Sequence, residues 1–119
     1  NISSIANSFG AETKISFREI TPSVNNNSKI NRVLRDSAIK ILGHKNVIEL
    51  QKPSLGAEDF AEFLNKVPGA MFRLGVSGKN SCAPLHSSKF DPDEKAISVG
   101  IKVIIESIVK LNNLQNKSS

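Results

Sequence analysis

Apolar and polar side chains change their spacing several times along the chain, and each spacing predicts a different element. Residues 1–8 have the pattern of a helix. Residues 11–20 alternate with a period of two, which predicts a half-buried strand. One side of this predicted strand carries Thr13, Ile15 and Phe17, and the other side carries Lys14, Ser16 and Arg18. The turn-forming residues 21–27, with Pro22 and a run of asparagines, then predict a hinge between two structural units.

Beyond the hinge, helical and extended patterns follow one another. Apolar residues recur every three or four positions over residues 28–42, which predicts an amphipathic helix packed on a sheet. Gly43 follows it, where a residue with positive φ is favoured. Residues 46–50 form a short β-branched stretch, a second helix is predicted over 57–65, and residues 70–76 are predicted to form a buried strand.

The last helix has the strongest signals of the sequence. Asp91 can cap it, Pro92 suits its first turn, and Glu94 has capping-box spacing. Its predicted buried side is made of isoleucines: Ile97, Ile101, Ile104, Ile105 and Ile108. Because helices and strands alternate after residue 28, we expect an α/β fold in which helices cover a central sheet.

Length and composition add a limit on what the chain can do alone. Its 119 residues suffice for one core but are few for an enzyme with a deep cleft. The first residue is Asn1 and not methionine, so we expect a longer parent protein. No apolar run reaches the roughly 18 residues of a membrane span, and we expect a cytoplasmic protein without membrane contact.

The net charge of +5 raises the question of nucleic-acid binding. The basic residues are scattered, none is adjacent to another, and there is no Tyr or Trp to stack on bases. We therefore expect a solvated basic surface and no nucleic-acid partner. The single cysteine, Cys82, excludes an internal disulfide and fits a reducing compartment.

His86 is the first candidate for chemistry, because it lies in a loop between a predicted strand and a strongly capped helix. A neutral imidazole is a good ligand for zinc, but a loop histidine is more often a surface or hydrogen-bonding residue. Cys82 is spaced so that it could share an ion with His86 or act as a nucleophile, or be an ordinary loop cysteine. His44 follows a helix end, where its partial positive charge suits the helix dipole.

A second candidate is the segment containing Gly56, Glu58 and Asp59. Carboxylates in the first turn of a helix are favoured by the helix dipole by up to about 1 kcal/mol, which accounts for them structurally. In the functional alternative, Gly56 allows a ligand to approach the backbone, and one of the acids faces a cleft or orients the loop of His86.

Taken in order, several stretches resemble the zinc-dependent aminoacylase and amidohydrolase family, which includes hippurate hydrolases, auxin-amino-acid conjugate hydrolases and N-acetyldiaminopimelate deacetylases. The stretches are residues 18–26, 56–60, 67–76 and 85–94. The resemblance implies an α/β catalytic domain interrupted by an α+β lid domain. Residues 1–24 would be the last helix and strand of a lid that forms a homodimer, and residues 25–119 the C-terminal part of the catalytic domain.

The same resemblance implies roles for individual residues. His86 would be the final ligand of a site with two divalent ions, zinc or else manganese or cobalt, while the other ligands and a general-base glutamate lie upstream. Gly56, Glu58, Asp59 and Ser87 would support the site or the substrate, an N-acyl amino acid. Ser88 departs from the proline that is common in relatives.

These expectations leave alternatives. Without the remainder of the enzyme, the chain should be inactive and only marginally stable. It could instead be a small basic module for binding or dimerisation, or a relative that has lost its metal.

Overall fold

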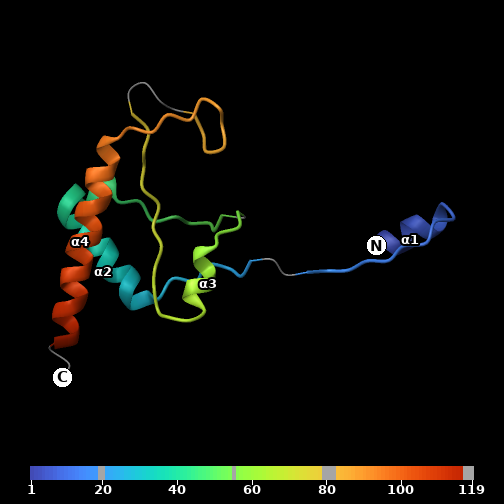
Figure 1. The fold of residues 1–119 in the computed structure, drawn as a ribbon, viewed down its shortest axis with the longest axis horizontal. Helices are drawn as coiled ribbons and strands as arrows, with labels where there is room; N and C mark the ends of the chain where they lie inside the picture. Colours follow the sequence, from blue (N-terminus) through green and yellow to red (C-terminus); the bar gives the residue numbers. More distant parts are fainter. Residues whose placement is uncertain (19–20, 55, 79–82, 117–119) are drawn as a thin grey trace.

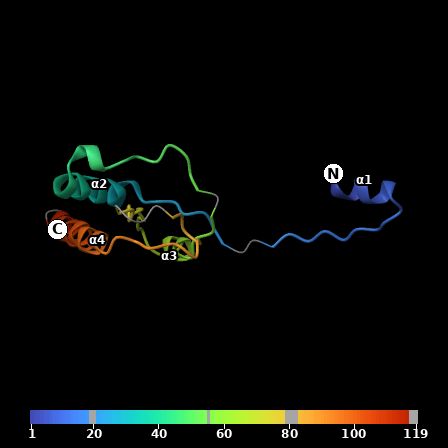
Figure 2. The same ribbon diagram turned by 90° about the horizontal axis from the view of Figure 1, so that it is seen from above.

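The computed structural model describes residues 1–18, 21–54, 56–78 and 83–116, and helices are its regular elements (Figure 1). Their bounds are α1 Ile2–Ser8, α2 Ser28–Leu42, the 3₁₀ helix η1 His44–Asn46, α3 Phe60–Leu64 and α4 Lys95–Asn116. Helices α2 and α4 lie side by side, and α1 stands apart at the end of a long extended arm (Figures 1 and 2). None of the helices in these ranges is long and apolar enough to cross a membrane.

Helix α2 has the predicted bounds, and local chemistry explains them. The side-chain oxygen of Asn27 accepts hydrogen bonds from the backbone N–H groups of Lys29 and Ile30, at 3.1 and 3.2 Å. Such a cap satisfies donors that have no partner within the helix. At the other end Gly43 has φ 80° and ψ 154°, which confirms the predicted positive φ. This combination is one that essentially only glycine adopts.

Helix α4 begins later than its predicted cap. The carboxylate of Asp93, not that of Asp91, accepts a hydrogen bond from the backbone N–H of Lys95 at 2.9 Å. Asp93 is itself fixed, because its N–H donates to the carbonyl of Val76 at 2.8 Å. The predicted capping by Asp91 is therefore wrong: the long-range bond to Val76 selects the residue at which the helix can start.

The buried side of α4 is also not the predicted one. Gly100, Val103 and Ser107 are the buried residues of α4, and they are small. By contrast, the isoleucines predicted to be buried are between 46% and 61% exposed: Ile97, Ile101, Ile104, Ile105 and Ile108. A side chain at Gly100 would come within 3.0 Å of Leu74, so a residue without a side chain suits this position. The isoleucine side has no covering layer among the described residues.

The predicted strands and their sheet are not formed in the described ranges, where only an isolated bridge at Gly78 has strand character. Residues 11–18 are fully extended and exposed, and residues 19–20 of this prediction lie outside the described ranges. Residues 46–50 contain the end of η1, and the predicted buried strand 70–76 is extended but partly exposed. A strand needs a neighbour for its backbone groups, and these segments find none here.

The remaining helices fit the predictions in part. The predicted helix over residues 1–8 is confirmed as α1, whereas that over residues 57–65 is shortened to α3. The arm formed by residues 1–18 carries two exposed aromatic side chains, Phe9 at 84% and Phe17 at 94%. Ala61 and Val103 are the buried hydrophobic residues among those described. The structure is therefore a helix pair with extended segments beside it, and not a closed α/β layer.

Candidate metal-ligand loop

The loop that carries His86 is built from two successive turns that share Ser87. The backbone N–H of Ser87 donates to the carbonyl of Pro84 at 3.2 Å, and the N–H of Phe90 donates to the carbonyl of Ser87 at 3.0 Å. The hydroxyl of Ser87 accepts from the N–H of Lys89 at 3.2 Å. Ser87, predicted as a supporting residue, is thus used to hold the loop.

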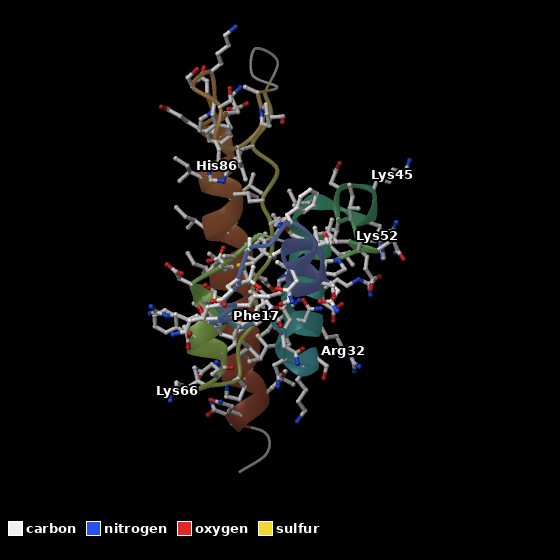
Figure 3. The ribbon with its side chains drawn as sticks, turned by 90° about the vertical axis from the view of Figure 1, so that its right-hand side faces the viewer. Phe17, Arg32, Lys45, Lys52, Lys66 and His86 are labelled. Carbon is white, nitrogen blue, oxygen red and sulfur yellow. The ribbon has the colours of Figure 1, made fainter. Side chains whose placement is uncertain are left out.

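His86 occupies the sterically unfavourable position of the first turn. Its φ is 66°. Among the described residues, no other residue except glycine has a positive φ. The side chain, labelled in Figure 3, is exposed and forms no hydrogen bond or ion pair with the residues that the structure describes. Unfavourable backbone geometry concentrates at functional sites, and both ring nitrogens of His86 remain available to a ligand.

The segment with the second group of candidates has a local structural explanation. A carboxylate oxygen of Glu58 accepts from the N–H of Phe60 at 3.3 Å, at the start of α3, and the N–H of Gly56 donates to the Ser54 hydroxyl at 3.2 Å. The carboxylate of Asp59 forms no capping bond. Gly56, Glu58 and Asp59 are all exposed, and no described hydrogen bond or ion pair joins them to the loop of His86.

The described residues do not form a metal site by themselves. No group of three or more His, Cys, Asp or Glu side chains among them is placed to hold an ion. Cys82 lies outside the described residues, and His44 is exposed at the start of η1. Since a catalytic zinc needs three protein ligands, a site that uses His86 must take its other ligands from elsewhere.

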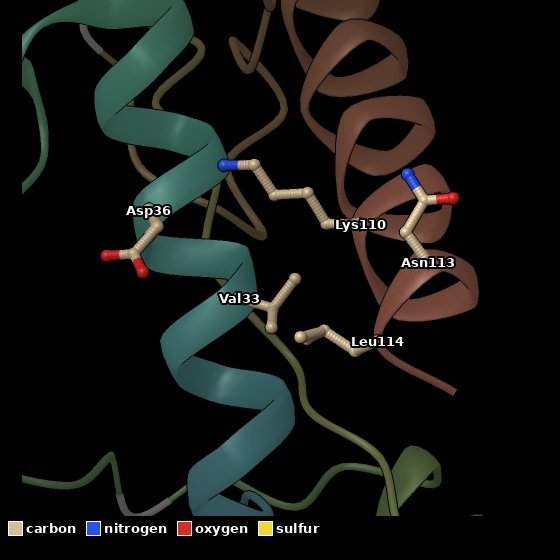
Figure 4. Close-up of a pocket in the computed structure, with 5 residues that line it drawn as sticks. All are labelled: Val33, Asp36, Lys110, Asn113 and Leu114. Carbon is tan, nitrogen blue, oxygen red and sulfur yellow. The ribbon is translucent and has the colours of Figure 1, made fainter. Parts of the chain in front are cut away.

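Among the hollows formed by the described residues, two on the helix pair stand out, and neither is lined by His86. One, of about 300 Å³, lies between α2 and α4 and is lined by Val33, Asp36, Lys110, Asn113 and Leu114 (Figure 4). The other, of about 560 Å³, lies between α2, α4 and the segments around residues 47–50 and 71–75. Neither hollow could be predicted from the sequence, because each depends on how distant segments meet.

Asn26 is a structural residue that the sequence pattern did not single out. Its amide nitrogen donates to the carbonyl of Met71 at 2.8 Å, and its amide oxygen accepts from the N–H of Met71 at 2.8 Å. The neighbouring N–H of Asn27 donates to the carbonyl of Gly69 at 2.8 Å. The predicted hinge is thus tied to residues 69–71 by three hydrogen bonds.

The basic side chains labelled in Figure 3 are spread over the molecule. Arg32 lies on α2 and Lys45 in η1, whereas Lys52 and Lys66 lie in loops. The absence of a nucleic-acid partner stays a prediction.

Comparison with known proteins gives one consistent result. The family described as Peptidase family M20/M25/M40 matches residues 9–110. The chain is 36% identical to a probable hydrolase of Synechocystis sp. over 84% of its own length and 26% of that protein. It is 37% identical to thermostable carboxypeptidase 1 of Saccharolobus solfataricus over 94% of its own length and 28% of that protein.

An N-acetyldiaminopimelate deacetylase of Pediococcus pentosaceus is 39% identical over 72% of the chain and 21% of the deacetylase. No solved structure matches the chain significantly. The chain spans about a quarter of the length of the curated relatives that it matches.

Proposed function

Because this chain belongs to the M20/M25/M40 peptidase family, we propose that it is part of a metal-dependent hydrolase that cleaves the amide bond of N-acyl amino acids or related conjugates. The relatives support this class of reaction, since carboxypeptidases and deacetylases both hydrolyse amide bonds. In this proposal residues 1–24 end a lid domain that forms a homodimer, and residues 25–119 belong to a cytoplasmic catalytic domain.

The observation that carries the proposal is the position of His86. Its exposed imidazole has no partner among the described residues, and it sits at φ 66° in a turn held by the hydrogen bonds of Ser87. A histidine fixed in this way can supply one ligand to a divalent ion, zinc or else manganese or cobalt. The other ligands and the general base must come from the rest of the polypeptide.

Gly56, Glu58 and Asp59 have a supporting role in this proposal. Glu58 fixes the start of α3 through the N–H of Phe60, so that this segment has a defined conformation. The geometry of the described residues gives no direct contact with His86, and we assign these residues to the surroundings of the substrate only.

A hybrid enzyme tests the proposal. The 115 matched residues of the Saccharolobus carboxypeptidase are replaced by the present chain, and hydrolysis of N-acyl amino acids is measured together with bound metal. We expect His86→Ala to lower activity by at least about 100-fold and to reduce the metal content, because an imidazole ligand is lost.

The matched control is His44→Ala, which removes the other exposed histidine and should leave activity and metal content unchanged. Full activity of the His86→Ala hybrid would exclude His86 as a ligand.

A further inference from the structure

The loop that carries His86 is closed at its base by Asp93. The backbone N–H of Asp93 donates to the carbonyl of Val76 at 2.8 Å, so the residue that follows the loop is joined to the residue that precedes it. In Figure 1 these yellow and orange ends of the loop meet near the start of α4. Of the loop itself, the structure describes residues 77–78 and 83–92.

Asp93 is also fixed by its other polar groups. Its carboxylate accepts a hydrogen bond from the N–H of Lys95 at 2.9 Å, and its carbonyl accepts one from the N–H of Ala96 at 3.0 Å. On its other side, a Cβ atom added to Gly78 would lie 3.0 Å from the Cβ of Asp93 and 3.1 Å from a carboxylate oxygen. The half-buried Asp93 side chain therefore packs directly on the backbone of Gly78 while it caps α4.

Two turns extend from this fixed end back to His86. The N–H of Phe90 donates to the carbonyl of Ser87, and the N–H of Ser87 donates to the carbonyl of Pro84. The imidazole of His86 has no hydrogen-bond partner among the described residues, so its place is set by the backbone of these turns. The position of the turns depends in turn on where the loop is anchored at Asp93.

We propose that Asp93 is a positioning residue for His86: it closes the base of the loop at the start of α4 and so presents the imidazole at a fixed place. The inference rests on the proposed function, in which His86 binds a divalent ion. A loop with a loosened base has more conformations, and the apparent affinity of a ligand falls with the fraction of the protein that is competent to bind it.

The neighbouring carboxylates do not share this arrangement. Asp91 and Glu94 are exposed, and neither side chain forms a hydrogen bond or ion pair with a described residue. Asp91 therefore provides a matched control, because it has the same side chain and the same charge two residues away from Asp93.

The test begins with amide hydrogen exchange in the metal-free hybrid with the Saccharolobus carboxypeptidase. Asp93→Ala keeps the N–H that binds Val76 but removes the cap that holds this residue at the start of α4. We expect the N–H groups of Ser87 and Phe90 to exchange about 5-fold faster in this variant. Asp93→Asn, which retains a capping oxygen, should restore slow exchange, and Asp91→Ala should leave it unchanged.

The same measurement separates a positioning role from simple capping of the helix. If Asp93 only caps α4, Asp93→Ala will speed exchange at Lys95, whose acceptor is lost, and not at Ser87 or Phe90. That result would overturn the proposal. Faster exchange at Ser87 and Phe90 that Asp93→Asn does not reverse would also overturn it, because the capping oxygen would then not be the cause.

Metal affinity gives the second measurement. Cobalt is titrated into each hybrid and followed by its visible absorption, under conditions in which circular dichroism shows that the variant is folded. We expect Asp93→Ala to weaken cobalt binding about 5-fold, and Asp93→Asn and Asp91→Ala to bind cobalt as the parent hybrid does. Equal affinity of Asp93→Ala and the parent would contradict the proposal.

These outcomes are distinct from those that test the proposed function. Loss of metal in His86→Ala, with unchanged exchange and cobalt affinity in Asp93→Ala, would keep the function and reject the role of Asp93. Full activity and metal content in His86→Ala would reject the ligand role of His86, and with it the inference that rests on that role.

Discussion

Ser37 places a polar hydroxyl group in a fully buried position. It lies on α2 at the contact with α4, is fully buried, and its hydroxyl has no hydrogen-bond partner among the described residues. Ser107, also buried, differs because its hydroxyl donates to the carbonyl of Val103 at 2.6 Å. A buried hydroxyl without a partner costs free energy of folding that a methyl group would not.

We therefore expect Ser37→Ala to increase the free energy of unfolding by about 1 kcal/mol. Urea denaturation followed by circular dichroism measures the change. The control, Ser107→Ala, removes a buried hydroxyl that has a hydrogen-bond partner and should not increase the free energy of unfolding. Destabilisation by Ser37→Ala would mean that the hydroxyl is satisfied in solution.

Gly43 sets the path of the chain after α2 through its φ of 80° and ψ of 154°. A side chain at this position is strained even though there is open space around it. We expect Gly43→Ala to lower the free energy of unfolding by about 1 to 3 kcal/mol. Gly75→Ala has equal space and no positive φ, so it serves as the control. Equal effects of the two substitutions in thermal unfolding would contradict a special role of φ.

An ion pair joins α2 and α4 at Glu106. Glu106 of α4 pairs with Lys40 of α2 at 2.8 Å and with Lys110 at 3.7 Å. The hydrogen bond from Lys40, aided by the positive charges of Lys40 and Lys110, lowers the pKa of Glu106. The ionised carboxylate therefore favours the helix pair.

A carboxyl group with a lowered pKa stabilises the folded state fully above its ordinary pKa and loses that effect as the pH falls through the lowered value. We expect the midpoint temperature of thermal unfolding to decrease as the pH falls through this acidic range. In Glu106→Gln this decrease should be smaller, because the titrating carboxyl group is absent. Glu94→Gln, at an exposed carboxylate that forms no ion pair with any described residue, is the control. An unchanged pH dependence in Glu106→Gln would show that this pair does not act in solution.

The elements themselves were predictable to different degrees. Helix α2 followed from its apolar period and from Gly43, because both signals are local. The buried side of α4 was not predictable from its isoleucines, since Gly100, Val103 and Ser107 are buried instead, and Gly100 lies against Leu74 of a distant segment. Its start depends on the bond between Asp93 and Val76, which joins residues far apart in the sequence.

At the scale of the whole molecule, the chain lacks a core of its own. Its radius of gyration is 20.5 Å. A compact chain of this length would have about 13.5 Å. The isoleucine side of α4 is exposed, and Ala61 and Val103 are the buried hydrophobic residues of the described ranges. The predicted sheet is not formed in the described ranges, because strands need partners that the described residues do not provide.

We expect the isolated chain to be only marginally stable, since hydrophobic burial is the main favourable term in folding. Scanning calorimetry should show a weak transition of low cooperativity. Reversible unfolding at high temperature, independent of protein concentration, would contradict this expectation.

The candidate site was predictable only as far as residue type and loop position allow. These two features singled out His86, but not its φ of 66° or the hydrogen bonds that Ser87 forms around it. The role of Asn26 was hidden because its partner, Met71, lies in a different segment. Metal ligands that lie outside this chain cannot be predicted from its residues.

The extended arm has a practical consequence for handling the protein. Residues 11–18 are exposed, and Phe17, Lys14 and Arg18 offer cleavage sites to common proteases in a backbone that fits an active-site cleft without unfolding. Cleavage there would release α1 and leave the paired helices α2 and α4 intact. Limited digestion therefore gives a direct route to the shorter fragment that contains the loop of His86.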